Sequence, residues 1–136
     1  MATKQFFTGM TGVFWVAAEL SQRNFIVSPT SRGAMGADLL VTDSGCKKAY
    51  SVQVKTDTTT NSFWLLNKKA KNLVSPSHYY VLVSLKKNGE KDFYVMPSKV
   101  VAQKVRYDKN DETSNFPYIT YKDAEPYRDA WHLFEE

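Results

Sequence analysis

Apolar residues recur at helical spacing near the start of the chain. Between Gly9 and about Arg23, the residues Val13, Val16 and Leu20 fall on one helical face. Further apolar residues widen this face, which indicates a helix that packs on more than one side. The polar residues that follow place the end of the predicted helix at about residue 24.

Strand patterns follow the helix. Phe25–Val27 is a short apolar run that is expected to end before Pro29, and the polar segment 28–36 is predicted to be a loop. Two strands are expected over residues 37–43 and 47–56, joined by a turn at 43–45. In the second strand, one face carries Tyr50, Val52 and Val54 and the other carries Ser51, Gln53 and Lys55.

The middle of the chain contains a further pair of strands. Residues 63–74 mix apolar residues with lysines and are predicted to be a loop that passes into a helix. Residues 79–85 carry the strongest strand pattern in the chain. A turn at Lys87–Glu90 is expected to return the chain into a second strand over residues 92–96, which completes a hairpin.

The C-terminal part is expected to be more irregular. A helix is predicted over residues 97–105, with Ser98 as its N-cap. Residues 106–120 are polar and are predicted to lack regular structure. The end of the chain is predicted to dock back on the body through three apolar side chains. These are Trp131, Leu133 and Phe134.

The order of elements indicates an α/β or α+β fold built on a mixed sheet. A chain of 136 residues is long enough for one domain with one sizeable core. We therefore expect residues 1–136 to form a single domain, with residues 106–136 as an acidic C-terminal extension. The sequence shows neither a signal peptide nor an apolar run long enough for a bilayer, so a cytoplasmic protein is expected.

Charge is distributed unevenly along the chain. Residues 1–107 carry 15 Lys and Arg against 6 Asp and Glu, a net of +9. Residues 108–136 carry 3 against 8, a net of −5. A body this basic suits a polyanionic partner such as nucleic acid, although a solvated lysine-rich surface is the plainer alternative.

An acidic residue stands at the start of one predicted strand, and the next predicted strand contains a Gln-x-Lys sequence. Asp38 precedes an apolar run, and Gln53 and Lys55 share one face of the following strand. Neighbouring strands would bring a carboxylate, an amide oxygen and an ammonium together over a hydrophobic floor. Such a group can hold a hard cation and direct a water at a phosphate, which indicates nucleic-acid cleavage.

The order of elements, together with Asp38 and Gln53-Val54-Lys55, resembles the PD-(D/E)XK nuclease superfamily. The resemblance implies a restriction-endonuclease-like αβββαβ core, with a mixed central sheet flanked by helices. Within the superfamily, the chain looks most like archaeal-type Holliday junction resolvases and Mrr-like endonucleases. The segments similar to theirs are GMTGVFWVAAELSQRNFIV and SPTSRGAMGADLLV, and the resemblance covers about residues 8–85.

The resemblance also implies roles for single residues. Asp38 matches the metal-binding aspartate, and Lys55 matches the lysine that orients or activates the attacking water. Gln53 stands where most members have Glu or Asp, a variant that is familiar in Mrr-like members. An Mg²⁺ or Mn²⁺ ion would be held by Asp38, the amide oxygen of Gln53 and a backbone carbonyl, that of Val54.

The first helix departs from the family pattern. Resolvase-like relatives usually carry a glutamate there that joins the metal site, and Val13 occupies that position here. Glu19 lies about 240° further around the helix and is expected to pair with Arg23 instead. Because the site then has one clear carboxylate, Asp38, it is expected to bind the ion weakly.

These expectations combine into a metal-dependent endonuclease that hydrolyses phosphodiester bonds in duplex or branched DNA. A homodimer is expected because two strands must be cut. The alternative is a decayed nuclease-fold protein that serves as a nucleic-acid-binding module, and an RNA target stays open.

Four basic residues are candidates for contacts with phosphate. Arg32 lies in a Ser- and Gly-containing loop next to the expected site. Lys68, Lys69 and Lys71 could form a phosphate-tracking surface, with Trp64 available for base stacking. For that surface, a solvated helix face with Trp64 in the core is an equal alternative. Alternatively, Lys55 could be a strand lysine without a function, whose ammonium extends into solvent.

Other chemistries lack the residues that they need. Cys46 is the single cysteine, which excludes an internal disulfide and a cysteine-based zinc site. His78 and His132 are isolated in the sequence, without partners for zinc binding or nucleophilic catalysis. No glycine pattern matches a nucleotide-binding loop.

Overall fold

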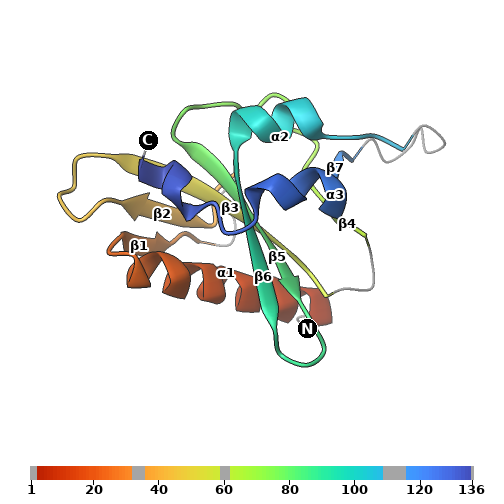
Figure 1. The fold of residues 1–136 in the computed structure, drawn as a ribbon, viewed down its shortest axis with the longest axis horizontal. Coiled ribbons are helices and arrows are strands. Elements are labelled where there is room, and N and C mark those ends of the chain that lie inside the picture. Colours follow the sequence, from red (N-terminus) through yellow and green to blue (C-terminus); the bar gives the residue numbers. More distant parts are fainter. Residues whose placement is uncertain (1–2, 32–35, 59–61, 109–115, 136) are drawn as a thin grey trace.

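A five-stranded mixed sheet forms the centre of the molecule, as predicted (Figure 1). The computed structural model describes residues 3–31, 36–58, 62–108 and 116–135. The strands, in their order across the sheet, are β1 (Ile26–Pro29), β2 (Leu39–Thr42), β3 (Ala49–Asp57), β5 (His78–Leu85) and β6 (Lys91–Pro97). β3 and β5 run parallel, whereas the other neighbouring strands are antiparallel.

Helices and a small second sheet cover the two faces of the central sheet. On one face lie the long helix α1 (Lys4–Gln22) and the C-terminal turn η2 (Trp131–Glu135). The other face carries α2 (Ser98–Lys104), α3 (Tyr121–Ala124), η1 (Glu125–Tyr127) and the antiparallel pair β4 (Phe63–Leu65) and β7 (Tyr118–Thr120). Figure 1 shows α1 on one side of the strands and α2 and α3 on the other.

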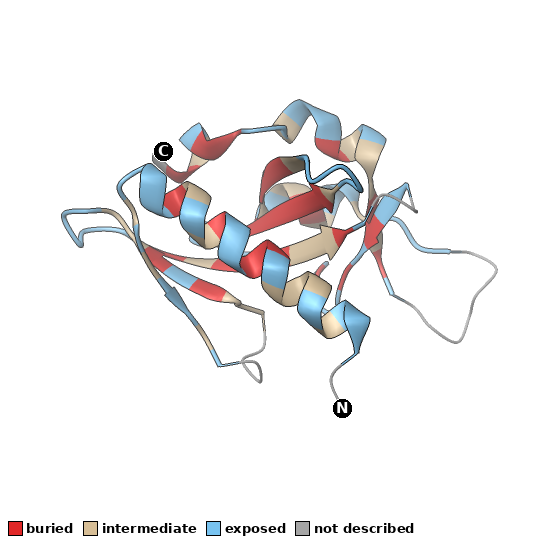
Figure 2. Ribbon diagram, turned by 90° about the horizontal axis from the view of Figure 1, so that it is seen from below, coloured by how far each residue is buried: buried red, intermediate tan, exposed pale blue. Residues whose placement is uncertain are grey.

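The central strands are buried on both faces (Figure 2). In β5, Val81 and Val83 point toward α1, whereas Tyr80 and Leu82 point toward α2 and β4. A strand that is covered on both sides reads as a continuous apolar run, which explains its strong signal in the sequence.

Several predicted elements are confirmed. α1 begins five residues earlier than predicted, at Lys4, where Thr3 caps it by accepting a hydrogen bond from the Phe6 N–H. The hairpin of β5 and β6 is present, and β2 and β3 lie at the expected places. Trp131 and Phe134 are buried against the sheet, so the C-terminal stretch docks as expected.

The helix predicted within residues 63–74 is wrong. The chain instead forms β4 and then a series of turns, with hydrogen bonds from the Ala70 N–H to the Asn67 carbonyl and from the Leu73 N–H to the Lys69 carbonyl. Trp64 and Leu66 are buried while Leu65 between them is exposed, which is the alternation of a strand. β4 pairs with β7, more than fifty residues later in the chain, and that pairing overrides the local helical preference.

Three smaller predictions also need correction. β1 includes Pro29 as its last residue, which an edge strand tolerates because Pro there need not donate to a partner. Ser98 is not an N-cap: α2 begins at Ser98 itself, whose hydroxyl donates to the Ser75 carbonyl and accepts from the Ser75 N–H. Within residues 106–120, the described part contains the short strand β7.

None of the helices in the described ranges combines the length and the apolar character needed to cross a membrane.

Candidate active site

The site lies where β2 stops and β3 continues with a partner strand, β5, on one side. β2 has four residues and β3 has nine, and their pairing ends at Leu39 opposite Val52. Beyond Val52, no strand of the described ranges pairs with β3 on the β2 side. Residues in this stretch alternate between the β5 side and the open edge, so the backbone groups of Val54 point to the open edge.

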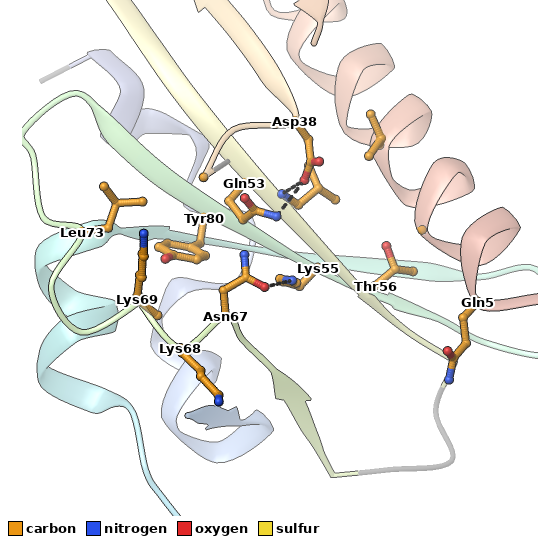
Figure 3. A pocket seen from close by; sticks show the side chains of 15 residues that line it. Gln5, Asp38, Gln53, Lys55, Thr56, Asn67, Lys68, Lys69, Leu73 and Tyr80 are labelled. Atoms are coloured by element: carbon orange, nitrogen blue, oxygen red, sulfur yellow. Dashed lines mark hydrogen bonds between the residues drawn. The ribbon is translucent and has the colours of Figure 1, made fainter. Parts of the chain in front are cut away.

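Asp38 takes the place of a strand at this open edge. Its N–H donates to the Val52 carbonyl at 2.8 Å, which continues the ladder by one residue. Its carboxylate then accepts from the Val54 N–H at 2.8 Å and from the Gln53 amide at 3.0 Å, both through Oδ2. The carboxylate is therefore held in one orientation by two donors from β3 (Figure 3).

The Lys55 side chain lies on the same face of β3 as Gln53, two residues further along, and lines the same cavity. Its Nζ donates to Oδ1 of Asn67 at 3.1 Å, and this contact joins β3 to the turn segment that follows β4 (Figure 3). Burial lowers the pKa of Lys55, and the negative charge of Asp38 opposes that effect in part. Lys55 is thus a half-buried ammonium within electrostatic reach of Asp38, not a lysine extended into water.

A cavity of about 870 Å³ joins these side chains. Asp38, Gln53 and Lys55 line it, and Lys68 and Lys69 from the turn segment lie on its wall. Three ammonium groups and one carboxylate thus surround the space among the described lining residues. The balance of charge favours an anionic group in the cavity.

Helix α1 forms another wall of the cavity. Gln5, Gly9 and Val13 recur every four residues and line it from one face of the helix. Val13 is buried at the position where the resemblance expects a glutamate, so α1 contributes an apolar group there. Glu19 lies elsewhere and pairs with Arg23 at 3.7 Å, as predicted.

Gly12 lets α1 lie directly on β3. A Cβ atom at this position would come within 1.8 Å of the Thr56 hydroxyl oxygen, a distance that no side chain can adopt. Thr56 also lines the cavity. The distance between the helix wall and the β3 wall of the site therefore depends on position 12 being a glycine.

The donors available to a cation are few. Within the described ranges, no three His, Cys, Asp or Glu side chains cluster closely enough to hold a metal ion. Asp57 is buried and accepts the Tyr121 hydroxyl at 2.7 Å, while Asp43 accepts two backbone N–H groups in the turn between β2 and β3. Oxygen donors at the cavity include the Asp38 carboxylate, the Gln53 amide and the Val54 carbonyl.

Not every predicted contact residue reaches the cavity. Lys71 is exposed and does not line the cavity, and Arg32 lies outside the described residues. Trp64 is 2% exposed, donates from Nε1 to the Val83 carbonyl and stacks on Tyr121, so its proposed role in base stacking is wrong. His78 is buried beside Ser51, away from the cavity lining.

The structure adds residues that the sequence patterns did not reveal. Asn67, Gln5 and Tyr80 line the cavity, yet each comes from a different element. The four-residue spacing of Gln5, Gly9 and Val13 in the sequence could have indicated that these residues share one face of α1. Asn67 had no such signal, because its position depends on β4 being a strand.

Comparison with known proteins finds similarity among solved structures. Neither a family model nor a curated protein matches the sequence. Among solved structures, the chain is similar to a bacterial homing endonuclease, with a TM-score of 0.61 and 19% sequence identity. The similarity covers 99% of this chain and 94% of that chain. At this identity, the two proteins share a fold across nearly their whole lengths.

Proposed function

We propose that this protein is an endonuclease of the PD-(D/E)XK type that hydrolyses phosphodiester bonds in DNA. The observation that carries the proposal is the convergence of Asp38, Gln53 and Lys55 on one cavity at the open edge of β3. The fold shared with a bacterial homing endonuclease supports it. The basic net charge of residues 1–107 suits a polyanionic substrate.

In this proposal, Asp38, the Gln53 amide oxygen and the Val54 carbonyl hold the metal ion. All three are hard oxygen donors, as Mg²⁺ or Mn²⁺ requires, and the backbone groups of Val54 point to the edge where Asp38 lies. A divalent cation bound there would supply charge to polarise a phosphate and to lower the pKa of a water. With one carboxylate and two neutral oxygens, affinity for the ion is weak.

Lys55 would act on the substrate from the other side of the cavity. Its ammonium has three donors, and Asn67 uses one of them. The two that remain can hold a phosphate oxygen and the attacking water. Lys68 and Lys69 on the wall of the cavity would contact neighbouring phosphates, and a homodimer would supply a second site for the second strand.

A specific observation favours a second candidate, a binding module with a decayed metal site. Gln53 directs its amide NH₂, not its oxygen, toward Asp38, and Val13 replaces a carboxylate on the helix wall. A cavity with this donor set can still bind phosphate through its ammonium groups. In that case nucleic acid, DNA or RNA, would bind without being cut.

A cleavage assay with matched variants separates the two candidates. Wild type, Asp38→Asn and Lys55→Met are incubated with supercoiled, linear and branched DNA in Mg²⁺, Mn²⁺ or a chelator. The endonuclease proposal expects cleavage by wild type that needs the cation and is lost in both variants, while DNA binding survives. Glu90→Gln removes an exposed carboxylate in the β5–β6 turn and serves as the control that keeps full activity.

The opposite results are equally clear. Binding by wild type without cleavage in either cation, unchanged by Asp38→Asn, establishes the binding module. Absence of binding to duplex, branched and single-stranded nucleic acid at low salt contradicts both candidates.

A further inference from the structure

Asn67 lines the cavity and is one of the residues there that the proposed function leaves without a role. It belongs to the turn segment after β4, and its side-chain oxygen accepts a hydrogen bond from Lys55 Nζ at 3.1 Å. We propose that Asn67 is a positioning residue that fixes the direction of the Lys55 ammonium toward the substrate. Its meaning for catalysis rests on the proposed function, whereas the contact itself does not.

The backbone on both sides of Asn67 is firmly held. Leu66 is 1% exposed, and its N–H donates to the Pro117 carbonyl at 2.8 Å. Ala70 is 1% exposed, and its N–H donates to the Asn67 carbonyl at 3.0 Å. An exposed amide side chain placed between two buried anchors has a defined position from which to orient a partner.

Lys55 needs such a partner because its own side chain does not define a direction. A lysine carries a compact charge on a flexible four-carbon stem and has about 2 kcal/mol of rotamer entropy to lose. The groups that face it across the cavity are Asp38 from the start of β2, Tyr80 from β5, and Lys68 and Lys69 from the turn segment. Of these, Asp38 alone carries a negative charge, and it would draw the ammonium toward the metal donors.

A neutral acceptor suits this position better than a charged one. The Asn67 oxygen accepts one hydrogen bond from the ammonium and leaves two donors for a phosphate oxygen and the attacking water. A carboxylate in its place would form an ion pair with Lys55 and repel the phosphate. The chemistry therefore explains why an amide lies here.

The test measures Lys55 directly, in the protein without DNA or metal. The order parameter of the Lys55 Cε methylene is measured by NMR on protein that carries lysine labelled with ¹³C at Cε, and Lys55→Met identifies the resonance of Lys55. Asn67→Ala should lower this order parameter, because the flexible lysine stem then lacks its fixed acceptor, whereas Asn67→Asp should keep it near the wild-type value. Asn72→Ala, an exposed asparagine in the same segment, should leave it unchanged.

Cleavage under single-turnover conditions then tests the catalytic meaning. Asn67→Ala and Asn67→Asp should each slow the step by about tenfold or more, equivalent to about 1.4 kcal/mol, with little change in DNA affinity for Asn67→Ala. Asn67 is exposed, so circular dichroism should confirm that both variants keep the fold.

The possible failures are distinguishable. A Lys55 order parameter that Asn67→Ala leaves unchanged overturns the positioning role. A lowered order parameter with an unchanged cleavage rate overturns its catalytic meaning. A lowered order parameter in a protein whose wild type cuts no substrate supports the contact and contradicts the proposed nuclease function.

Discussion

The carboxylate of Asp38 has a structural role in addition to any role in binding a metal ion. Its Oδ2 accepts from the Val54 N–H and the Gln53 amide, and it thereby satisfies the edge of β3 where β2 is missing. Loss of the carboxylate leaves a partly buried N–H without its acceptor. Stability and activity must therefore be measured together in any Asp38 variant.

Substitutions at Asp38 should separate these two tasks. Asp38→Ala is expected to lower the free energy of unfolding by about 1–3 kcal/mol, the cost of leaving a buried donor unpaired. Asp38→Asn keeps an acceptor oxygen and should cost less than about 1 kcal/mol, while removing the charge and with it cleavage. Urea denaturation gives both values, and equal destabilisation by the two substitutions would contradict the hydrogen-bonding task.

Lys55 should show an unusual pH dependence. Burial lowers its pKa, so Lys55 loses its proton at a lower pH than exposed lysines do. Its contribution to phosphate binding is present at neutral pH and disappears as the pH rises through that lowered pKa. DNA affinities of wild type and Lys55→Met should therefore converge at a pH below the ordinary lysine pKa of about 10.4.

An exposed lysine supplies the comparison for this measurement. Lys87→Met, in the turn between β5 and β6, should bind DNA like wild type at every pH, so it should show no pH-dependent difference in affinity. A difference between wild type and Lys55→Met that persists to the ordinary lysine pKa would show that the Lys55 ammonium is not buried.

At the same scale, the sequence predicted which residues of the candidate site lie together where their geometry is local. Asp38, Gln53 and Lys55 follow from one antiparallel strand pair and the alternation within β3. Asn67 did not follow, since it meets Lys55 only through the folding of the β4 segment onto the sheet. The orientation of the Gln53 amide was likewise invisible, because both of its ends are compatible with the pattern.

Among the elements, α1 and β3 are joined by a contact that admits no side chain. Gly12 is buried against Thr56, and the hydroxyl of Thr56 has no hydrogen-bond partner among the described residues. Val13, beside Gly12, and Thr56 both line the cavity. The helix is therefore a wall of the site and not merely a cover for the sheet.

Gly12→Ala should separate the helix from the strand. The added Cβ would meet the Thr56 hydroxyl at 1.8 Å, so we expect a loss of about 1–3 kcal/mol in the free energy of unfolding, as for an overpacked core. Thr56→Ala in the same chain should restore part of that loss, which a double-mutant cycle measures. Gly45→Ala, whose Cβ would have its nearest neighbour at 3.8 Å, should change stability by less than about 0.5 kcal/mol.

Elements were predictable where their contacts are local. The β5–β6 hairpin and the amphipathic helix α1 carry their periods within a single segment. β4 was mistaken for part of a helix because its partner β7 lies in a stretch that reads as irregular. The alternation of buried Trp64, exposed Leu65 and buried Leu66 is too short to outweigh the lysines that follow.

At the scale of the whole molecule, the change in net charge along the chain does not coincide with a boundary of the core. The net charge changes sign near residue 108, yet the acidic C-terminal part supplies Trp131 and Phe134 to the core and β7 to the second sheet. The Tyr79 hydroxyl also donates to the Leu133 carbonyl at 2.9 Å. The expected extension is thus, in its described part, a component of the fold.

Nucleic-acid binding should depend strongly on salt. The slope of log K against log salt should be negative, with about 0.9 contributed by each phosphate neutralised on duplex DNA. Lys68→Ala with Lys69→Ala should reduce its magnitude by up to about 1.8, because both lysines line the cavity. Lys87→Ala should leave the slope unchanged, and a slope that the double variant does not alter would exclude these lysines from phosphate contact.

The unequal lengths of β2 and β3 have a consequence for how this protein could change over time. If β2 continued alongside β3, backbone groups would take up the Val54 N–H and occupy the space beside Asp38. A shift in where one short strand ends could therefore open or close the site without altering any side chain that lines it. Under the proposed function, a relative that keeps Asp38 and Lys55 but extends this strand would lack an open site.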